Sequence, residues 1–221
     1  MENTELYNKY PNIPLLSFID RGELESFSVL EIGCYRGTNL IYVKEKYPNC
    51  ICCGVDIDKE AISIAEKGID CAIVADIEKQ SLHFDEKSFD YIIFGDVLEH
   101  LKDPLSCLIY CERFLKDSGK ILISIPNIQH ISILRELVHG RFIYEDTGLL
   151  DKTHLKFFTY YDFLLLLKNA HLSPKQIIHR IVPIDEECTK LIDYLLSFNS
   201  SDVKKFMYEA YQYMVVAQKE E

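Results

Sequence analysis

The sequence predicts an α/β protein built on an open, doubly wound and mostly parallel sheet. Short apolar segments with strand character alternate with helix-forming segments between residues 28 and 125, an order typical of parallel strands joined by right-handed crossovers. The first strand runs into a glycine turn, Gly33–Gly37, and helix formers resume at Leu40. Glycines let the backbone approach a ligand, and the helix N-terminus behind them presents free N–H groups. The turn therefore predicts a ligand site at the end of the first strand.

Turn and capping residues bound the elements of this alternating part. Pro48 ends the first helix, Asp58 can cap the second, and Gly68 stops it. The triplet Asp117–Gly119 marks a turn before the fifth strand. We expect strands at Val29–Ile32, Cys50–Asp56, Cys71–Ala75, Tyr91–Phe94 and Lys120–Ile125, and helices at Thr38–Tyr47, Asp58–Lys67 and Pro104–Leu115.

The pattern changes beyond Pro126. A short helix closed by Gly140 precedes an irregular segment, Arg141–Phe158, and Thr159 with Asp162 resembles a capping box that opens another helix. We find no repeat, low-complexity run or linker, so residues 1–221 are expected to form a single domain. We expect helices at Ile131–His139, Tyr160–Asn169 and Glu186–Phe198, and strands at Lys175–Val182 and Tyr211–Gln218.

Composition and charge indicate which binding partners and which cellular location to expect for the protein. The chain has 221 residues and a formal charge of −11, with 35 acids against 24 Lys and Arg, so it should repel the phosphates of nucleic acids. The longest leucine stretch, Leu164–Leu167, is far too short to span a membrane. The first ten residues contain no basic region followed by an apolar core, so no secretory signal is expected. The sequence predicts a cytoplasmic protein with no nucleic-acid partner and no membrane span.

The eight cysteines show no metal-binding pattern. None forms a C-x-x-C pair with a second pair or with a histidine at zinc spacing. Buried, reduced thiols are the simpler interpretation. We therefore expect no metal site.

The end of the second strand indicates the kind of ligand. Asp56 follows a buried strand, and in open α/β sheets this position faces the crevice where a carboxylate can accept hydrogen bonds from ribose hydroxyls. The glycines Gly33 and Gly37 do not follow the G-x-G-x-x-G pattern of nicotinamide cofactor sites. The residues predict a cofactor that contains a nucleoside, without naming it.

The spacing G-x-x-x-G after the acidic strand residue Glu31 resembles motif I of the class I S-adenosylmethionine (SAM) methyltransferases. Three further segments match that family in order: ADIE (Ala75–Glu78), FDYIIFGDVLEHLKDP (Phe89–Pro104) and LKDSGKILISIPN (Leu115–Asn127). The resemblance implies a seven-stranded, Rossmann-like sheet with an antiparallel last strand. It also implies SAM as cofactor and S-adenosylhomocysteine as product.

The resemblance assigns roles at the cofactor site. It places Glu31 beneath the methionine part, Asp56 at the ribose hydroxyls, Asp76 at the adenine amino group, and Asp96 beside the sulfonium. The alternatives are that Glu31 pins the turn and that Asp76 is a surface turn residue. Tyr35 departs from the family, in which a middle glycine is usual. The expected cofactor-binding residues are Glu31, Gly33, Cys34, Gly37, Asp56, Ile57, Asp76, Ile77, Asp96 and Val97.

Two segments are expected to cover the site. In relatives, an N-terminal segment such as residues 1–27 folds over the cofactor as a lid, and Tyr7 and Tyr10 could close it. Its apolar stretch Ile13–Ile19 should pack on the domain. The segment Ser124–Thr159 resembles a methyltransferase subgroup associated with glycan and polysaccharide biosynthesis, which implies a substrate-side insertion over residues 127–159.

Methyl transfer mainly requires alignment and exclusion of water, and a general base is needed only for a poor nucleophile such as a hydroxyl. The candidate bases are histidines near strand ends, His100, His130 and His154. Asp151, three residues before His154, could orient its ring. The alternative is that Asp151 caps a turn and His154 satisfies a backbone carbonyl. The expected catalytic residues are His154, Asp151 and His100.

These features predict a SAM-dependent methyltransferase that acts on a small molecule or a glycan precursor, with oxygen as the favoured acceptor atom. A carbon or nitrogen acceptor is the first alternative. A non-catalytic binding module that keeps the fold is the second. The identity of the acceptor and the oligomeric state are not predicted.

Overall fold

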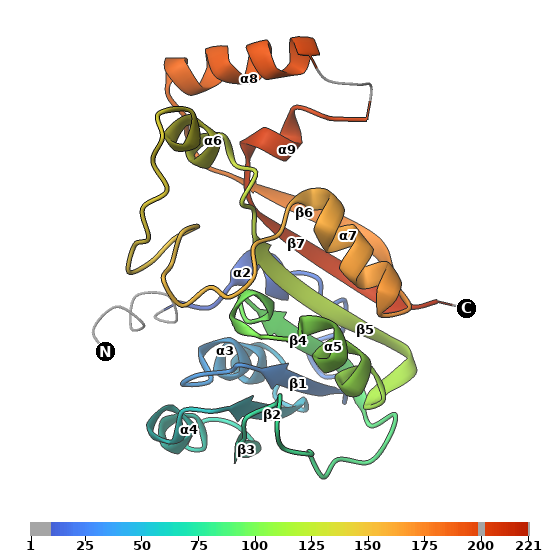
Figure 1. Ribbon diagram of the computed structural model, residues 1–221. Coiled ribbons are helices and arrows are strands. Elements are labelled where there is room, and N and C mark those ends of the chain that lie inside the picture. Colours follow the sequence, from blue (N-terminus) through green and yellow to red (C-terminus); the bar gives the residue numbers. More distant parts are fainter. Residues whose placement is uncertain (1–9, 199–201, 221) are drawn as a thin grey trace.

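The computed structural model describes residues 10–198 and 202–220, and seven strands form one twisted sheet in the order β3-β2-β1-β4-β5-β7-β6 (Figure 1). The strands from β3 to β5 pair in parallel, whereas β7 is antiparallel to both β5 and β6. Six strands therefore share one direction and the last is reversed, which confirms the predicted fold class. The strands are β1 Ser28–Ile32, β2 Ile51–Asp56, β3 Cys71–Val74, β4 Phe89–Gly95, β5 Leu115–Pro126, β6 Leu172–Ile181 and β7 Ala210–Lys219.

The helices follow the predicted order with three additions, the 3-10 helix η1 and the short helices α2 and α9. The capping box of Thr159 and Asp162 is present, and it opens α7 at the predicted residue. Two short helices, α2 and α9, were not predicted because each is a single turn without its own periodicity. The helices are α2 Ile13–Leu16, α3 Thr38–Lys46, α4 Lys59–Ala65, the 3-10 helix η1 Leu98–His100, α5 Pro104–Glu112, α6 Ile131–Val138, α7 Tyr160–Asn169, α8 Glu186–Phe198 and α9 Phe206–Glu209.

The boundary between α5 and β5 differs from the prediction. The helix ends at Glu112 and not at Leu115, because Leu115 already pairs with Phe89 of β4. A register irregularity between Phe89 and Tyr91 accommodates the residues of the expected turn, so β5 is twelve residues long. Long-range pairing has overridden the local turn signal here.

Both faces of the sheet are buried, as a doubly wound fold requires. Consecutive residues of β4 alternate between two apolar clusters: Ile92 packs with Leu108 of α5 and Phe163 of α7, whereas Ile93 packs with Leu15 of α2 and Leu40 of α3. Burial of Leu15 within the stretch Ile13–Ile19 confirms that this stretch packs on the domain; Tyr7 lies outside the described residues.

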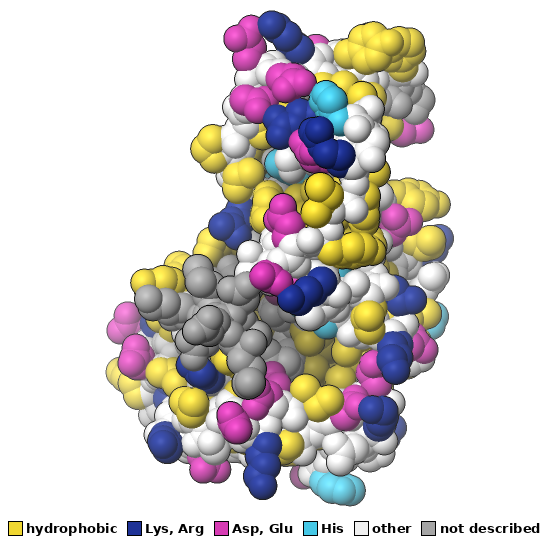
Figure 2. Space-filling view, turned by 60° about the vertical axis from the view of Figure 1, so that its left-hand side comes forward, with side chains coloured by type: hydrophobic (Ala, Val, Ile, Leu, Met, Phe, Trp, Pro, Cys, Tyr) yellow, Lys and Arg dark blue, Asp and Glu magenta, His cyan; other side chains and the backbone are white. Residues whose placement is uncertain are grey.

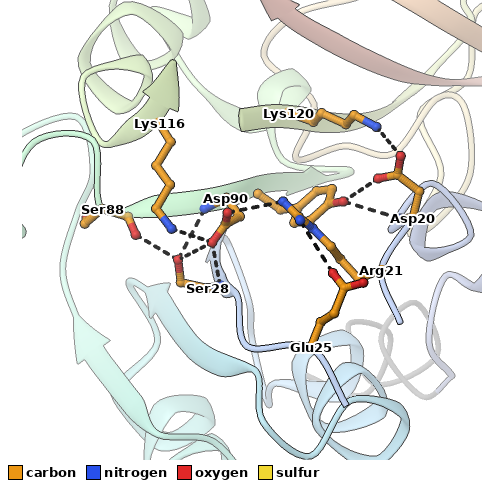
Figure 3. Close-up of polar contacts among 9 residues, drawn as sticks. Asp20, Arg21, Glu25, Ser28, Ser88, Asp90, Lys116 and Lys120 are labelled. Atoms are coloured by element: carbon orange, nitrogen blue, oxygen red, sulfur yellow. Dashed lines mark hydrogen bonds and ion pairs between the residues drawn. The ribbon is translucent and has the colours of Figure 1, made fainter. Parts of the chain in front are cut away.

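The N-terminal ends of β1 and β4 are held by a polar network (Figure 3). Asp90 accepts hydrogen bonds from the Ser28 backbone N–H at 2.9 Å and from Lys116 Nζ at 2.7 Å. Beside it, Asp20 accepts from the Tyr91 hydroxyl at 2.5 Å and from Lys120 Nζ at 2.6 Å. This network ties the segment before β1 to the sheet and leaves the opposite, carboxyl ends of the strands for a site.

A smaller apolar cluster of α6, α8 and α9 lies above strands β6 and β7 in the view of Figure 1. All eight cysteines are free, as expected, and only Cys71 is more than marginally exposed. None of the described helices is both long and apolar enough to cross a membrane.

Candidate functional site

A cavity of about 1050 Å³ opens at the carboxyl ends of the parallel strands. Its walls come from the turn after β1, the ends of β2 and β3, the loop after β4, and Asp146 and residues 151–155 of the insertion. Among the described residues, eight carboxylates and three lysines line it. The predicted site residues that line it are Gly33, Asp56, Ile57, Asp76, Ile77, Asp96, Val97, His100, Asp151 and His154.

The glycine turn brings the backbone of β1 against the loop after β4. Gly33 has φ +71°, and a Cβ there would lie 2.6 Å from Val97 Cγ2, so only glycine fits. Gly37, with φ +74°, is the N-cap of α3. Tyr35 also has a positive φ, 48°, and its side chain lines the cavity. The structure thus accommodates a tyrosine at the position where the resemblance implies glycine.

Asp56 anchors this turn. Its Oδ2 accepts the Tyr35 backbone N–H at 2.7 Å, and its Oδ1 accepts the Asp58 backbone N–H at 2.8 Å. Burial raises the pKa of Asp56 above its usual range. Asp58 caps α4 through the N–H groups of Glu60 and Ala61, so Asp56 is left to face the cavity.

Glu31 and Cys34 lie beneath the turn and are not among the lining residues. The Glu31 side chain accepts from Asn39 Nδ2 at 2.6 Å, and its Oε2 has no hydrogen-bond partner among the described residues. Burial raises the pKa of Glu31 to about 8. The Cys34 thiol packs against Gly54 of β2. The Cys34 side chain is therefore a core contact, and a cofactor could meet only its backbone.

The loops after β3 and β4 carry two further predicted aspartates. Asp76 forms an ion pair with Lys79 at 2.6 Å, which lowers the pKa of the carboxyl group, and it accepts the Glu78 backbone N–H. Asp76 thus caps its own turn and also lines the cavity. Asp96 has φ +53° and accepts a hydrogen bond from Gln212 of β7. Sequence reasoning missed Gln212 because β7 lies more than a hundred residues further along the chain.

The far end of the cavity contains Glu99, His100 and His154. Glu99, which was not predicted as a site residue, is 1% exposed, and burial, with the nearby charge of Asp96, raises its pKa well above the usual range. The rings of His100 and His154 stand edge to face with centroids 4.8 Å apart. Burial lowers the pKa of His154, which favours the neutral imidazole.

The predicted hydrogen bond between Asp151 and His154 is not formed. Asp151 Oδ1 accepts from the backbone N–H and the hydroxyl of Thr153, at 2.7 and 2.6 Å, so it caps the local turn. His154 Nδ1 instead lies 3.3 Å from the Leu149 carbonyl oxygen. The structure therefore shows Asp151 as the cap of the local turn and the His154 ring against a backbone carbonyl, with no direct hydrogen bond between the two side chains.

Comparison with known proteins identifies the family. A model described as a methyltransferase domain matches residues 7–176. Comparison with curated proteins found no significant match.

Solved structures share the fold at low identity. A chain of a Haloferax volcanii complex that contains the Trm112 methyltransferase activator is 16% identical, with a TM-score of 0.66 over 100% of this chain and 92% of that one. A Thermotoga maritima SAM-dependent methyltransferase, described as a possible histamine N-methyltransferase, is 16% identical with a TM-score of 0.66, covering 99% and 94%. An Archaeoglobus fulgidus SAM-dependent methyltransferase is 18% identical with a TM-score of 0.64, covering 97% and 94%. The chain therefore belongs to the methyltransferase domain family and is a SAM-dependent methyltransferase.

Proposed function

We propose that this enzyme transfers the methyl group of SAM to an oxygen atom of a small molecule or glycan precursor. SAM, when bound, supplies an electrophilic methyl group on a sulfonium sulfur and leaves as S-adenosylhomocysteine. The excess of carboxylates in the cavity suits this cation electrostatically. The buried Glu31 Oε2 beneath the glycine turn has no hydrogen-bond partner among the described residues, which leaves a polar atom there for a cofactor to meet.

The predicted cofactor residues that line the cavity have positions compatible with their proposed roles. Asp56 would accept from the ribose hydroxyls, since a carboxylate oxygen that already takes one N–H keeps a second lone pair. Asp76 and Ile77 would meet the adenine at the end of β3, and Asp96 and Val97 would flank the reacting centre. The backbone of Gly33 would let the methionine part approach β1 closely.

The proposal that oxygen is the acceptor atom rests on the histidines at the far end of the cavity. A neutral amine attacks the methyl group with its own lone pair, whereas a hydroxyl must lose a proton to become an effective nucleophile. His100 and His154 bring imidazole nitrogens to the cavity beside Asp96. Imidazole nitrogens at that position would take up the proton of a hydroxyl acceptor, which favours oxygen over a neutral amine.

The insertion over residues 127–159 is proposed to form the acceptor side. Its residues Asp146 and Asp151–Leu155 line the cavity, whereas none of the described residues 10–27 does. Apolar side chains are exposed on the insertion at Ile143 and Tyr144, and Figure 2 shows hydrophobic side chains on this side of the molecule. In the cavity itself Leu101 and Leu155 lie at this end with Glu99 and His154, so an acceptor with polar hydroxyls and an apolar part fits these surroundings.

The test is a transfer assay with methyl-labelled SAM and a panel of sugars, nucleotide sugars, phenols and primary amines. Label should enter hydroxyl compounds, and the Asp56→Ala variant should lose this activity. Label found only in amines or at carbon would overturn the oxygen acceptor. The exposed Asp117→Ala variant serves as the control, because Asp117 pairs with Lys87 at the opposite end of β5.

A further inference from the structure

Glu99, His100 and His154 form a compact cluster of metal-ligating side chains at the acceptor end of the cavity. One ligand atom of each residue lies within 4.8 Å of the others. Glu99 and His100 belong to η1, and His154 belongs to the insertion. Two backbone hydrogen bonds hold the segments together, from Leu155 N and Lys156 N to the Glu99 carbonyl oxygen at 2.8 and 3.0 Å.

The Glu99 carboxyl group is incompletely satisfied. It is 1% exposed, lines the cavity, and its Oε2 has no hydrogen-bond partner among the described residues. A buried carboxylate without a partner is unfavourable unless a cation or donors compensate for its lost hydration. The neighbouring Asp96 and Asp151 add negative charge, and of the nearby lysines Lys152 is paired with Asp146. A bound cation would supply this missing complement.

Both imidazole rings are oriented as metal ligands commonly are. His100 Nδ1 lies 3.2 Å from the Thr153 carbonyl oxygen and 3.2 Å from Thr153 Oγ1, and His154 Nδ1 lies 3.3 Å from the Leu149 carbonyl oxygen. An Nδ1–H directed at a carbonyl leaves the lone pair on Nε2. The Thr153 hydroxyl in turn donates to Asp151, which makes Asp151 and Thr153 positioning residues behind the His100 ring.

We propose that Glu99, His100 and His154 bind a divalent transition-metal ion at the acceptor end of the cavity. Two imidazole nitrogens and one carboxylate suit ions such as Zn²⁺ or Mn²⁺ better than Mg²⁺. Ligand atoms around such an ion lie roughly 3 to 3.5 Å apart, so small side-chain rotations would close the cluster. Three protein ligands leave coordination positions of the ion open for an oxygen atom of the acceptor or of water.

The role of this ion rests on the proposed function. A hydroxyl oxygen bound to the ion would release its proton to a solvent base more readily. The oxygen would then form its bond to the methyl carbon as the carbon–sulfur bond breaks. An acceptor with two adjacent hydroxyls could occupy two open positions, which makes a vicinal diol the favoured acceptor class. His154 would then be a ligand and not the base.

The proposed site differs from the expectation that the chain has no metal site. That expectation rested on cysteine spacing. The ligands proposed here come from two segments, and neither segment alone contains a metal-binding pattern.

The test is a titration of the full-length, chelator-treated protein with MnCl₂, in which free Mn²⁺ is followed by electron paramagnetic resonance. We expect one bound Mn²⁺ per chain, displaced by ZnCl₂. In Glu99→Gln and in His154→Gln the affinity should fall by more than about tenfold. His139→Gln is the matched control, because the exposed His139 ring also faces a carbonyl, that of Arg135 at 2.8 Å, but has no such cluster around it.

A thermal-shift titration with S-adenosylhomocysteine verifies that each variant is folded and retains its cofactor site. Absence of Mn²⁺ and Zn²⁺ binding, or binding that the two ligand variants leave unchanged, would overturn the metal site and return His154 to the role of base. Mn²⁺ bound by a protein that methylates only amines would instead overturn the oxygen acceptor and leave the metal site standing. The two failures are thus distinguishable.

Discussion

The imidazole rings of His100 and His154 meet edge to face with centroids 4.8 Å apart, which joins the loop after β4 to the insertion. The same two segments are linked through the Glu99 carbonyl oxygen, which accepts from Leu155 N and Lys156 N. The far wall of the cavity therefore exists only when the insertion is docked. The cofactor end, by contrast, is built from strand ends of the sheet itself, so the two ends should respond differently to substitution.

We expect Asp56→Ala to lose the stabilisation given by S-adenosylhomocysteine. A ligand at 100 times its dissociation constant stabilises by about 2.7 kcal/mol, which is several degrees in a thermal-shift experiment. Asp56→Asn, which keeps the shape of the side chain, should weaken binding by at least about tenfold because charged hydrogen bonds are lost. An undiminished shift in both variants would exclude Asp56 from cofactor binding. Asp117→Ala should behave as the parent protein does.

We expect Gly33→Ala to be more harmful than Gly140→Ala, although both glycines have φ near +75°. Backbone strain alone costs about 1–2 kcal/mol at either position. The new Cβ at Gly33 would also lie 2.6 Å from Val97 Cγ2, whereas nothing lies within 4 Å at Gly140. Urea unfolding should show the larger loss for Gly33→Ala, and adding Val97→Ala should restore part of it. Equal losses would contradict this steric explanation.

The cofactor end of the site could be predicted because its determinants are local in the sequence. A strand, a glycine turn and a carboxylate at the next strand end each lie within a few residues, so the spacing of Gly33, Asp56 and Asp76 was enough to bring them to one cavity. The capping box at Thr159 was found for the same reason. The long β5 was missed because its first residue is fixed by pairing with Phe89.

The acceptor end could not be predicted from spacing. Asp151 and His154 have the separation of a hydrogen-bonded pair, but the nearer N–H and hydroxyl of Thr153 compete successfully for the carboxylate. Glu99 is adjacent to a predicted histidine, yet its burial depends on an insertion that follows some fifty residues later. The contacts of Asp151 thus depend on local turn chemistry and the burial of Glu99 on long-range docking, and sequence separation indicates neither reliably.

We expect Asp90→Asn to lower stability without affecting the cofactor site. The substitution keeps the side-chain shape but removes the charge that pairs with Lys116, and it weakens the hydrogen bond from Ser28 N. Because Lys116 is partly exposed, the loss should be about 1–2 kcal/mol in urea unfolding. The shift given by S-adenosylhomocysteine should stay unchanged, since Asp90 lies at the opposite ends of the strands. A reduced shift would show that the two ends are coupled.

We expect Glu31→Gln to remove a pH dependence of stability between pH 4.5 and about 8. In the folded protein burial raises the pKa of Glu31 from 4.5 to about 8. Between these values the folded state holds a proton that the unfolded state has lost, so the free energy of unfolding falls as pH rises, by up to about 1.4 kcal/mol per unit. Glutamine keeps the bond from Asn39 but cannot ionise. Urea unfolding at pH 5, 6.5 and 8 should show a flatter profile for Glu31→Gln than for the exposed control Glu45→Gln, and parallel profiles would mean that Glu31 is ionised in the folded protein.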